Sequence, residues 1–82
     1  MILTKSDEAV IRAAMMGGRK ITLTRAAPDG TRLTVTTHNA GPAWDTVMVA
    51  QARMQDRYIT QVQNFGTTAE LVEAIERWTA IR

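Results

Sequence analysis

The sequence contains no cysteine, a single histidine (His38) and a single serine (Ser6). Without cysteine the chain forms no disulfide, no thiolate nucleophile and no cysteine-based zinc site. His38 has no second histidine and no carboxylate at ligand spacing, so no metal site is indicated. A Ser–His–acid triad would need Ser6 as the nucleophile, but this serine stands at a predicted helix start and is better explained as its cap. We therefore expect a protein that is not an enzyme and that holds neither a metal nor a cofactor.

Long apolar runs are also missing. No segment approaches the roughly 20 apolar residues of a membrane span. The short apolar start of the chain is followed by Asp7 and Glu8 and not by the apolar stretch of a signal peptide. We expect no membrane partner and a cytoplasmic location.

The composition is that of a folded globular chain. Of the 82 residues, 45% are hydrophobic and 22% are charged, so we expect residues 1–82 to form one domain. The net charge of +2 is unevenly placed. Residues 1–38 hold six basic and three acidic residues, whereas residues 39–82 hold four basic and five acidic residues. This mild charge asymmetry is a hint about partners.

Two segments have the pattern of amphipathic helices. Ser6, as a cap before two acids, predicts a helix over residues 7–16 that ends at Gly17-Gly18. A second helix follows Thr67-x-x-Glu70, which is the pattern of a capping box. Its apolar stripe consists of Leu71, Ala74, Ile75, Trp78 and Ile81.

Residues 19–38 predict a β-hairpin. Ala27-Pro28-Asp29-Gly30 suits a type I turn followed by a left-handed glycine. With Ala27 opposite Thr31, the alternation of apolar and polar residues selects the same register as the turn. One face then pairs Leu23 with Val35, Ile21 with Thr37 and Arg25 with Leu33; the other pairs Thr24 with Thr34, Thr22 with Thr36 and Lys20 with His38. We expect Arg25 to reach past the edge of the core to water.

The segment from residue 45 to 55 fits two patterns. Val47 and Val49 alternate as in a strand, whereas Trp44, Val47, Met48 and Met54 recur at helical spacing. We favour a strand at 46–53 that turns through Met54-Gln55-Asp56 into a strand at 57–65. The second strand has apolar residues on both faces, which suits a central strand or contact with a partner. The predicted fold is α+β: an antiparallel four-stranded meander, α-β-β-β-β-α, with both helices covering one face, and the alternative is α-β-β-α-β-α.

The polar face of the hairpin is the main candidate for a binding surface. The residues predicted to contact a partner are Arg19, Lys20, Thr22, Arg32, Thr34, His38 and Trp44. The positive charges and hydroxyl groups of this face suit phosphate oxygens, but threonine is also common on solvated strand faces. The face has no aromatic residue for stacking on a base, which counts against nucleic acid. For Trp44 we favour a role as a lid over the edge of the core, and the alternative is an interface anchor.

We expect a small non-enzymatic protein that docks onto another protein. Its small size and compact α/β architecture are similar to those of accessory proteins of phages or mobile elements that inhibit host systems. This comparison is an analogy at the level of the fold. The alternative is a weak nucleic-acid-binding protein that uses the basic hairpin face. The sequence is compatible with a homodimer.

Overall fold

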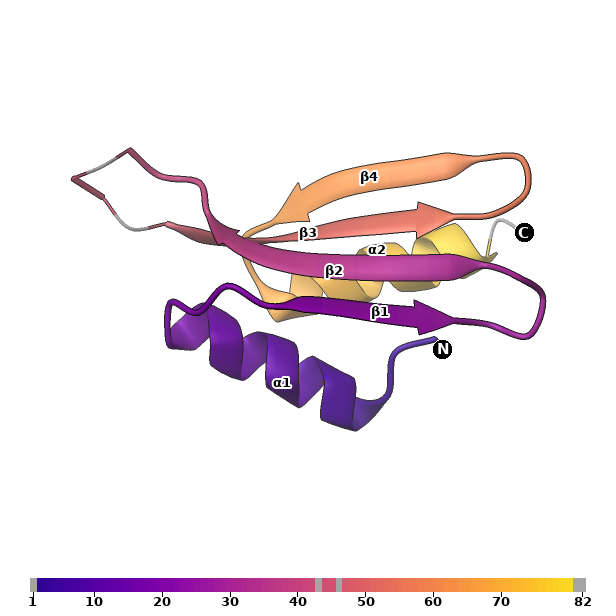
Figure 1. Cartoon of the computed structure of the whole chain (residues 1–82), viewed down its shortest axis with the longest axis horizontal. Coiled ribbons are helices and arrows are strands. Elements are labelled where there is room, and N and C mark those ends of the chain that lie inside the picture. The colour runs from indigo at the N-terminus through magenta and orange to yellow at the C-terminus, as the bar shows by residue number, and fades with distance from the viewer. Residues whose placement is uncertain (1, 43, 46, 81–82) are drawn as a thin grey trace.

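A computed structural model describes residues 2–42, 44–45 and 47–80. Its elements are α1 (Lys5–Met16), β1 (Thr22–Ala26), β2 (Arg32–Asn39), β3 (Met48–Gln55), β4 (Thr60–Phe65) and α2 (Thr68–Ala80) (Figure 1). This confirms the predicted α-β-β-β-β-α order. The alternative with a helix near residues 45–55 is wrong, because β3 occupies most of that segment.

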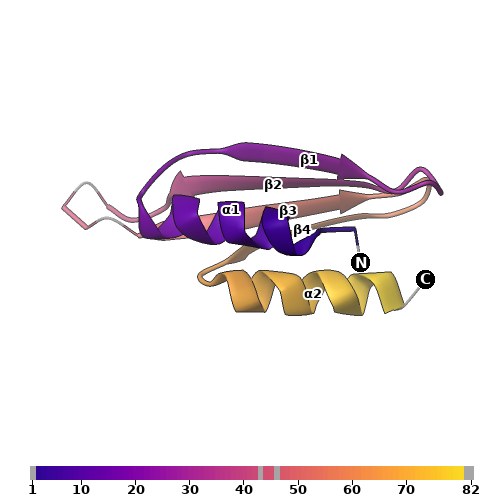
Figure 2. The same cartoon turned by 90° about the horizontal axis from the view of Figure 1, so that it is seen from below.

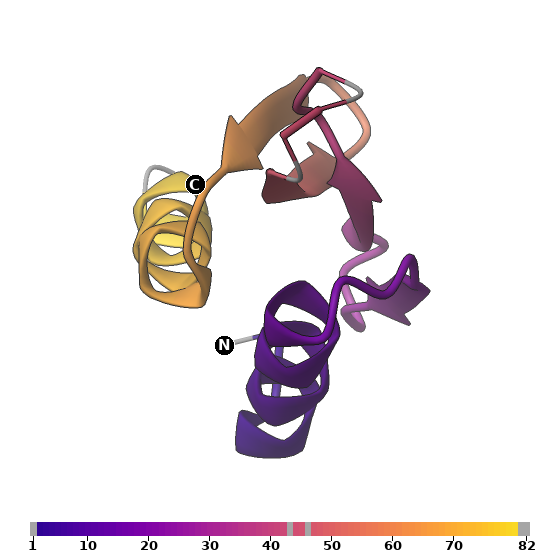
Figure 3. The same ribbon diagram turned by 90° about the vertical axis from the view of Figure 1, so that its left-hand side faces the viewer.

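The four strands form one antiparallel sheet in the order β1-β2-β3-β4. Both helices lie on the same side of this sheet, as predicted (Figure 2). Seen from its end, the sheet curves around the helix layer and its other side is bare (Figure 3). Here we name the bare side the open face and the covered side the helix face.

The first hairpin has the predicted register. Leu23 lies opposite Val35, and Thr24 lies opposite Thr34. In the turn, Gly30 N donates to the Ala27 carbonyl at 3.0 Å, and Gly30 has the predicted left-handed conformation with φ = 93°. The ladder begins at Thr22, so Lys20 lies before the paired residues of β1.

Helix α1 begins earlier than predicted, and Ser6 is not its cap. Thr4 Oγ1 accepts from Asp7 N at 3.0 Å, while Asp7 Oδ2 accepts from Thr4 N at 3.1 Å. This capping box satisfies two backbone donors at once, which a serine cap at position 6 would not do. At α2 the predicted cap is present, since Thr67 Oγ1 accepts from Glu70 N at 3.2 Å.

The predicted turn at Met54-Gln55-Asp56 is wrong. The turn runs from Asp56 to Ile59, because Asp56 Oδ1 accepts from the backbone N of both Tyr58 (2.8 Å) and Ile59 (2.7 Å). Strand β4 therefore starts at Thr60 instead of residue 57, and it is an edge strand and not a central one.

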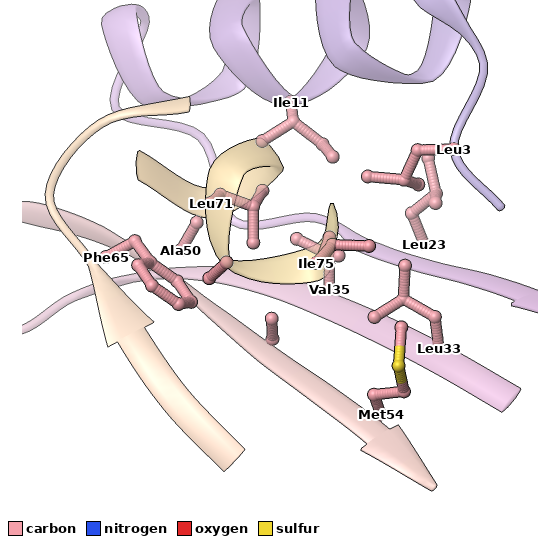
Figure 4. Close-up of a cluster of buried hydrophobic side chains, with 12 residues drawn as sticks. Leu3, Ile11, Leu23, Leu33, Val35, Ala50, Met54, Phe65, Leu71 and Ile75 are labelled. Atoms are coloured by element: carbon pink, nitrogen blue, oxygen red, sulfur yellow. The ribbon is translucent and has the colours of Figure 1, made fainter. Parts of the chain in front are cut away.

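The core lies between the helix face and the two helices (Figure 4). Its fully buried large side chains are Ile11, Leu33, Val35, Leu71 and Ile75. Ala50 and Ala52 on β3 are also completely buried, and their small size lets the helices approach the middle of the sheet. Trp78 packs on this core as predicted, with its ring 6.1 Å from that of Phe65.

Candidate functional site

The open face carries positive charge without any acid. Side chains alternate between the two faces along each strand, so the register places one set together. The open face consists of Thr22, Thr24, Ala26, Arg32, Thr34, Thr36, His38, Val49, Gln51, Arg53, Gln55, Thr60, Val62 and Asn64. None of the four strands contains Asp or Glu. The result is a layer of hydroxyl and amide groups with arginines as its permanent charges.

Four of the predicted contact residues meet on this face: Thr22, Arg32, Thr34 and His38. Thr34 lies opposite Arg53 of β3, which extends the basic hairpin face into the second half of the sheet. The sequence analysis predicted a strand at 46–53 but no register between it and the first hairpin, so Arg53 was not predicted to lie beside Thr34. The pairing of β2 with β3 places it there.

Arg19 and Lys20 lie outside the sheet, in the connection between α1 and β1, where both are exposed. Arg19 N donates to the Ala14 carbonyl at 2.8 Å. A Cβ built on Gly17 would lie 3.6 Å from Arg19 Nε, so the guanidinium group stands beside the C-terminus of α1. A cation there stabilises the helix dipole, and Arg19 thus has a structural role.

Thr37 anchors the entry into β1 from the helix face. Its side chain is fully buried. The hydroxyl accepts from Ile21 N at 2.9 Å and donates to the Arg19 carbonyl at 2.7 Å. One buried hydroxyl therefore satisfies two backbone groups just before the ladder begins.

Arg25 does not simply reach water as predicted. Its Nη2 lies 2.8 Å from Asp7 Oδ1, and its Nε donates to Asp7 Oδ2 at 3.2 Å. The hydrogen bonds from Arg25, and then that from the Thr4 backbone, lower the pKa of Asp7 below its ordinary 3.8, against the opposing effect of burial. This pair joins the first turn of α1 to β1.

Trp44 is 88% exposed, so the prediction of a lid over the core is wrong. It belongs to the loop between β2 and β3, which extends beyond the body of the sheet (Figure 1). Asn39 Oδ1 holds this loop by accepting from Gly41 N (3.0 Å) and Val47 N (3.2 Å). The Asn39 contacts order the base of the loop that carries the tryptophan.

Tyr58 is a second exposed aromatic residue, and it was not among the predicted contact residues. It is 85% exposed in the turn between β3 and β4. The guanidinium carbon of Arg57 lies 5.9 Å from the centre of its ring, within the range of a cation–π contact. Trp44 and Tyr58 therefore stand at opposite ends of β3.

Among the residues that the structure describes, no three His, Asp or Glu side chains are grouped to hold a metal ion. Over the same residues, no helix is both long and apolar enough to cross a membrane. Near Arg32 the open face ends in a depression of about 290 Å³ between the two turns, lined by Asp29, Gly30, Arg32, Gln55, Asp56 and Arg57. Basic and acidic groups are mixed in it, in contrast to the acid-free strands.

These features define a small α+β domain, a four-stranded antiparallel meander with two helices on one face. No protein-family model, no curated protein and no solved structure matches this chain. The features of this domain that bear on function are the open face and the two exposed aromatic residues.

Proposed function

We propose that this chain is a non-enzymatic docking protein whose open face binds an acidic surface of another protein. The observation that carries the proposal is a complete sheet face, uncovered by the chain's own helices, that holds Arg32 and Arg53 and no carboxylate. A carboxylate-rich surface is electrostatically complementary to such a face. Threonine hydroxyls and glutamine amides add hydrogen-bonding groups between the charges.

The types of exposed residue around this face also favour a protein partner. Trp, Tyr and Arg are the residues most enriched among those that dominate binding energy at protein interfaces. Trp44 and Tyr58, with 88% and 85% of their surface exposed, flank β3 at its two ends. We propose Trp44 as an anchor of the contact, in place of its rejected role as a lid.

The test is an affinity capture from the native cytoplasm with three immobilised proteins of this sequence. These are the wild type, an open-face variant (Arg32→Gln with Arg53→Gln) and a helix-layer variant (Arg12→Gln with Arg77→Gln). Both variants lose the same net charge from exposed arginines. A partner of the open face is retained by the wild type and the helix-layer variant, and binds the open-face variant at least about tenfold more weakly, since two charged contacts are removed.

If every captured protein binds the two variants equally, the open face is not the docking surface. Trp44→Ala supplies a second measurement on a captured partner. Truncation of an anchor residue costs about 2 kcal/mol or more, which is a weakening of about thirtyfold. An unchanged affinity would remove Trp44 from the site.

We also propose, within this function, that the chain is an accessory inhibitor that acts in the cytoplasm, as in phages or mobile elements. Docking on an acidic surface blocks any ligand that uses the same surface. Adding the wild type to a captured partner should then reduce the partner's own activity, and the open-face variant should not. A partner with undiminished activity at saturation would exclude inhibition while leaving docking intact.

The second candidate function is weak binding of nucleic acid. It is favoured by one observation, the absence of acids from the four strands. Phosphate contacts must show at low salt and weaken as salt is raised. Titration of labelled duplex and single strands at two salt concentrations tests this, and absence of binding at low salt rejects it. The open face offers no aromatic residue for stacking, which is why we place this candidate second.

A further inference from the structure

We infer that the outer edge of β4 pairs with the same edge of a second copy of this chain, which makes a homodimer with a continuous eight-stranded sheet. The inference does not rest on the docking function. Strand β4 ends the sheet, and no described element lies beyond it (Figures 1 and 3). The residues from Thr60 to Asn64 are all exposed, so the edge is free for pairing along five residues.

The turn between β3 and β4 determines which backbone N–H and C=O groups of β4 point away from β3. Asp56 N donates to the Ile59 carbonyl at 3.0 Å, so these two residues form a hydrogen-bonded pair. In an antiparallel ladder such pairs alternate with non-hydrogen-bonded pairs. The N–H and C=O groups of Gln61 and Gln63 therefore point towards β3, and those of Thr60, Val62 and Asn64 point outward.

The edge also lacks the usual protection against pairing. Natural edge strands are blunted by charged side chains, by proline or by a bulge. The sequence of β4, TQVQNF, has no charge and no proline, and its pairing with β3 is regular over six residues. At the opposite edge, β1 contains the charged residue Arg25. Of the two edge strands, β4 is therefore the one without a charged side chain.

A two-fold axis through Val62 gives a self-complementary register. Val62 then forms a hydrogen-bonded pair with its counterpart, and Thr60 pairs with Asn64 of the second copy. On the helix face, Gln61 meets Gln63 of the second copy. All three outward-pointing residues are used, and no charged side chain faces another.

The same register brings apolar groups together at both ends of the interface. Ile59 lies opposite Phe65 of the second copy on the helix face. Ile59 is 56% exposed in the single chain, whereas Phe65 is buried against Trp78. Pairing therefore covers an exposed isoleucine beside an existing aromatic cluster. Val62, which is 53% exposed, is covered by its own counterpart on the open face.

The dimer is tested by sedimentation of the whole chain over a wide concentration range. Val62→Lys places two like charges next to the axis, where they repel. Thr24→Lys is the matched control, because it adds the same charge at an exposed open-face position of the other edge strand. We expect the wild type and Thr24→Lys to sediment as dimers with a similar dissociation constant, and Val62→Lys to dissociate at least about tenfold more readily. Circular dichroism checks that each variant is folded.

A cysteine substitution gives a second readout that does not depend on weakened folding. The chain has no cysteine of its own, and Val62→Cys would face its counterpart at a Cα separation of about 5.5 Å, which a disulfide can bridge. With oxidised glutathione, the two thiols transfer two electrons and two protons to the oxidant, which leaves as two reduced glutathione molecules. Val62→Cys should form the covalent dimer much faster than Thr24→Cys.

Three results would overturn the inference. They are a wild type that stays monomeric up to millimolar concentration, a dimer that Val62→Lys leaves intact, and equal cross-linking of the two cysteine variants. A monomer that binds added strand peptides along β4 would also reject the second copy in favour of an extended segment of another protein. Each of these outcomes leaves the docking proposal standing, because that proposal concerns the open face.

Discussion

At the residue scale, two polar contacts, each with one buried side chain, connect parts of the chain that sequence patterns treat separately. The Asp7 carboxylate completes the capping box of α1 and also pairs with Arg25 of β1. Thr37 joins β2 to the backbone just before β1. Each contact satisfies groups that would lose free energy if they were buried alone. Both therefore predict measurable effects of small substitutions.

Asp7→Asn should lower the free energy of unfolding by about 1–2 kcal/mol at neutral pH, because the charge that Arg25 binds is removed. The folded-state pKa of Asp7 is below its ordinary 3.8. Its stabilisation is therefore complete above about pH 5 and is lost as the pH falls through 3.8 to the folded-state pKa. Urea unfolding at several pH values measures this, and the gap between wild type and variant should close in acid.

The control for Asp7→Asn is Glu76→Gln, at an exposed position of α2. It should change the free energy of unfolding by less than about 0.5 kcal/mol at neutral pH. A gap for Asp7→Asn that is independent of pH would contradict the role of the Asp7 charge.

Thr37→Val should destabilise the protein by about 1–3 kcal/mol, because the shape is kept while Ile21 N and the Arg19 carbonyl lose their partner. Thr36→Val is the matched control, since it makes the same change one residue earlier on the open face. Thr36→Val should leave the free energy of unfolding nearly unchanged, because valine is well tolerated in strands. Denaturant unfolding compares the two variants, and equal effects would show that the buried hydroxyl does not matter.

At the element scale, the loop between β2 and β3 determines how Trp44 is presented. Its ends are joined by a bond from Ala40 N to the Val47 carbonyl at 2.7 Å. A Cβ on Gly41 would overlap the carbonyl oxygen of Asp45, so this position requires glycine. The loop is therefore a specified structure, and its shape depends on Asn39 and Gly41.

Asn39→Ala should loosen this loop without unfolding the sheet. It removes the acceptor for Gly41 N and Val47 N, and the two amides should then exchange with solvent at least about fivefold faster, as expected when a bond worth about 1 kcal/mol is lost. Hydrogen exchange followed by NMR measures both amides directly. Amides of Val35 and Ala52 in the middle of the sheet provide the control and should be unaffected. Unchanged exchange at Gly41 and Val47 would show that the side chain is not what holds the loop.

At the scale of the whole molecule, the charges are separated by layer. The strands contain no acid, while the two helices hold Asp7, Glu8, Glu70, Glu73 and Glu76. The sequence showed this only as a small difference between the two halves of the chain. In the folded protein it becomes a difference between the open face and the helix layer, which orients an approaching polyanion.

This layering predicts face-dependent retention on a polyanionic heparin column at low salt. The open-face variant should elute at lower salt than the helix-layer variant, although both carry the same net charge, because only the first weakens the acid-free face. Identical elution would show that net charge alone governs the interaction. A protein with a sequence pI of about 9.7 is positively charged under these conditions in either case.

The sequence by itself determined the elements whose signals are local. The turn at Ala27–Gly30 and the alternation of residues 21–37 specified the register of the first hairpin, and the amphipathic stripes specified both helices. These signals depend on neighbours only a few residues apart. The placement of Thr22, Arg32, Thr34 and His38 on one face followed from the same register.

Only the tertiary structure decided the features that depend on distant parts of the chain. For residues 45–55 the sequence favoured a strand but also fitted a helix, and the pairing of Met48–Gln55 with β2 on one side and β4 on the other decides for the strand. The sheet order places β4 at an edge, which the sequence pattern did not show. The ion pair of Arg25 with Asp7 and the exposure of Trp44 also depend on contacts between distant parts of the chain. Burial and pairing depend on which surfaces meet in space, and short-range patterns contain no information about that.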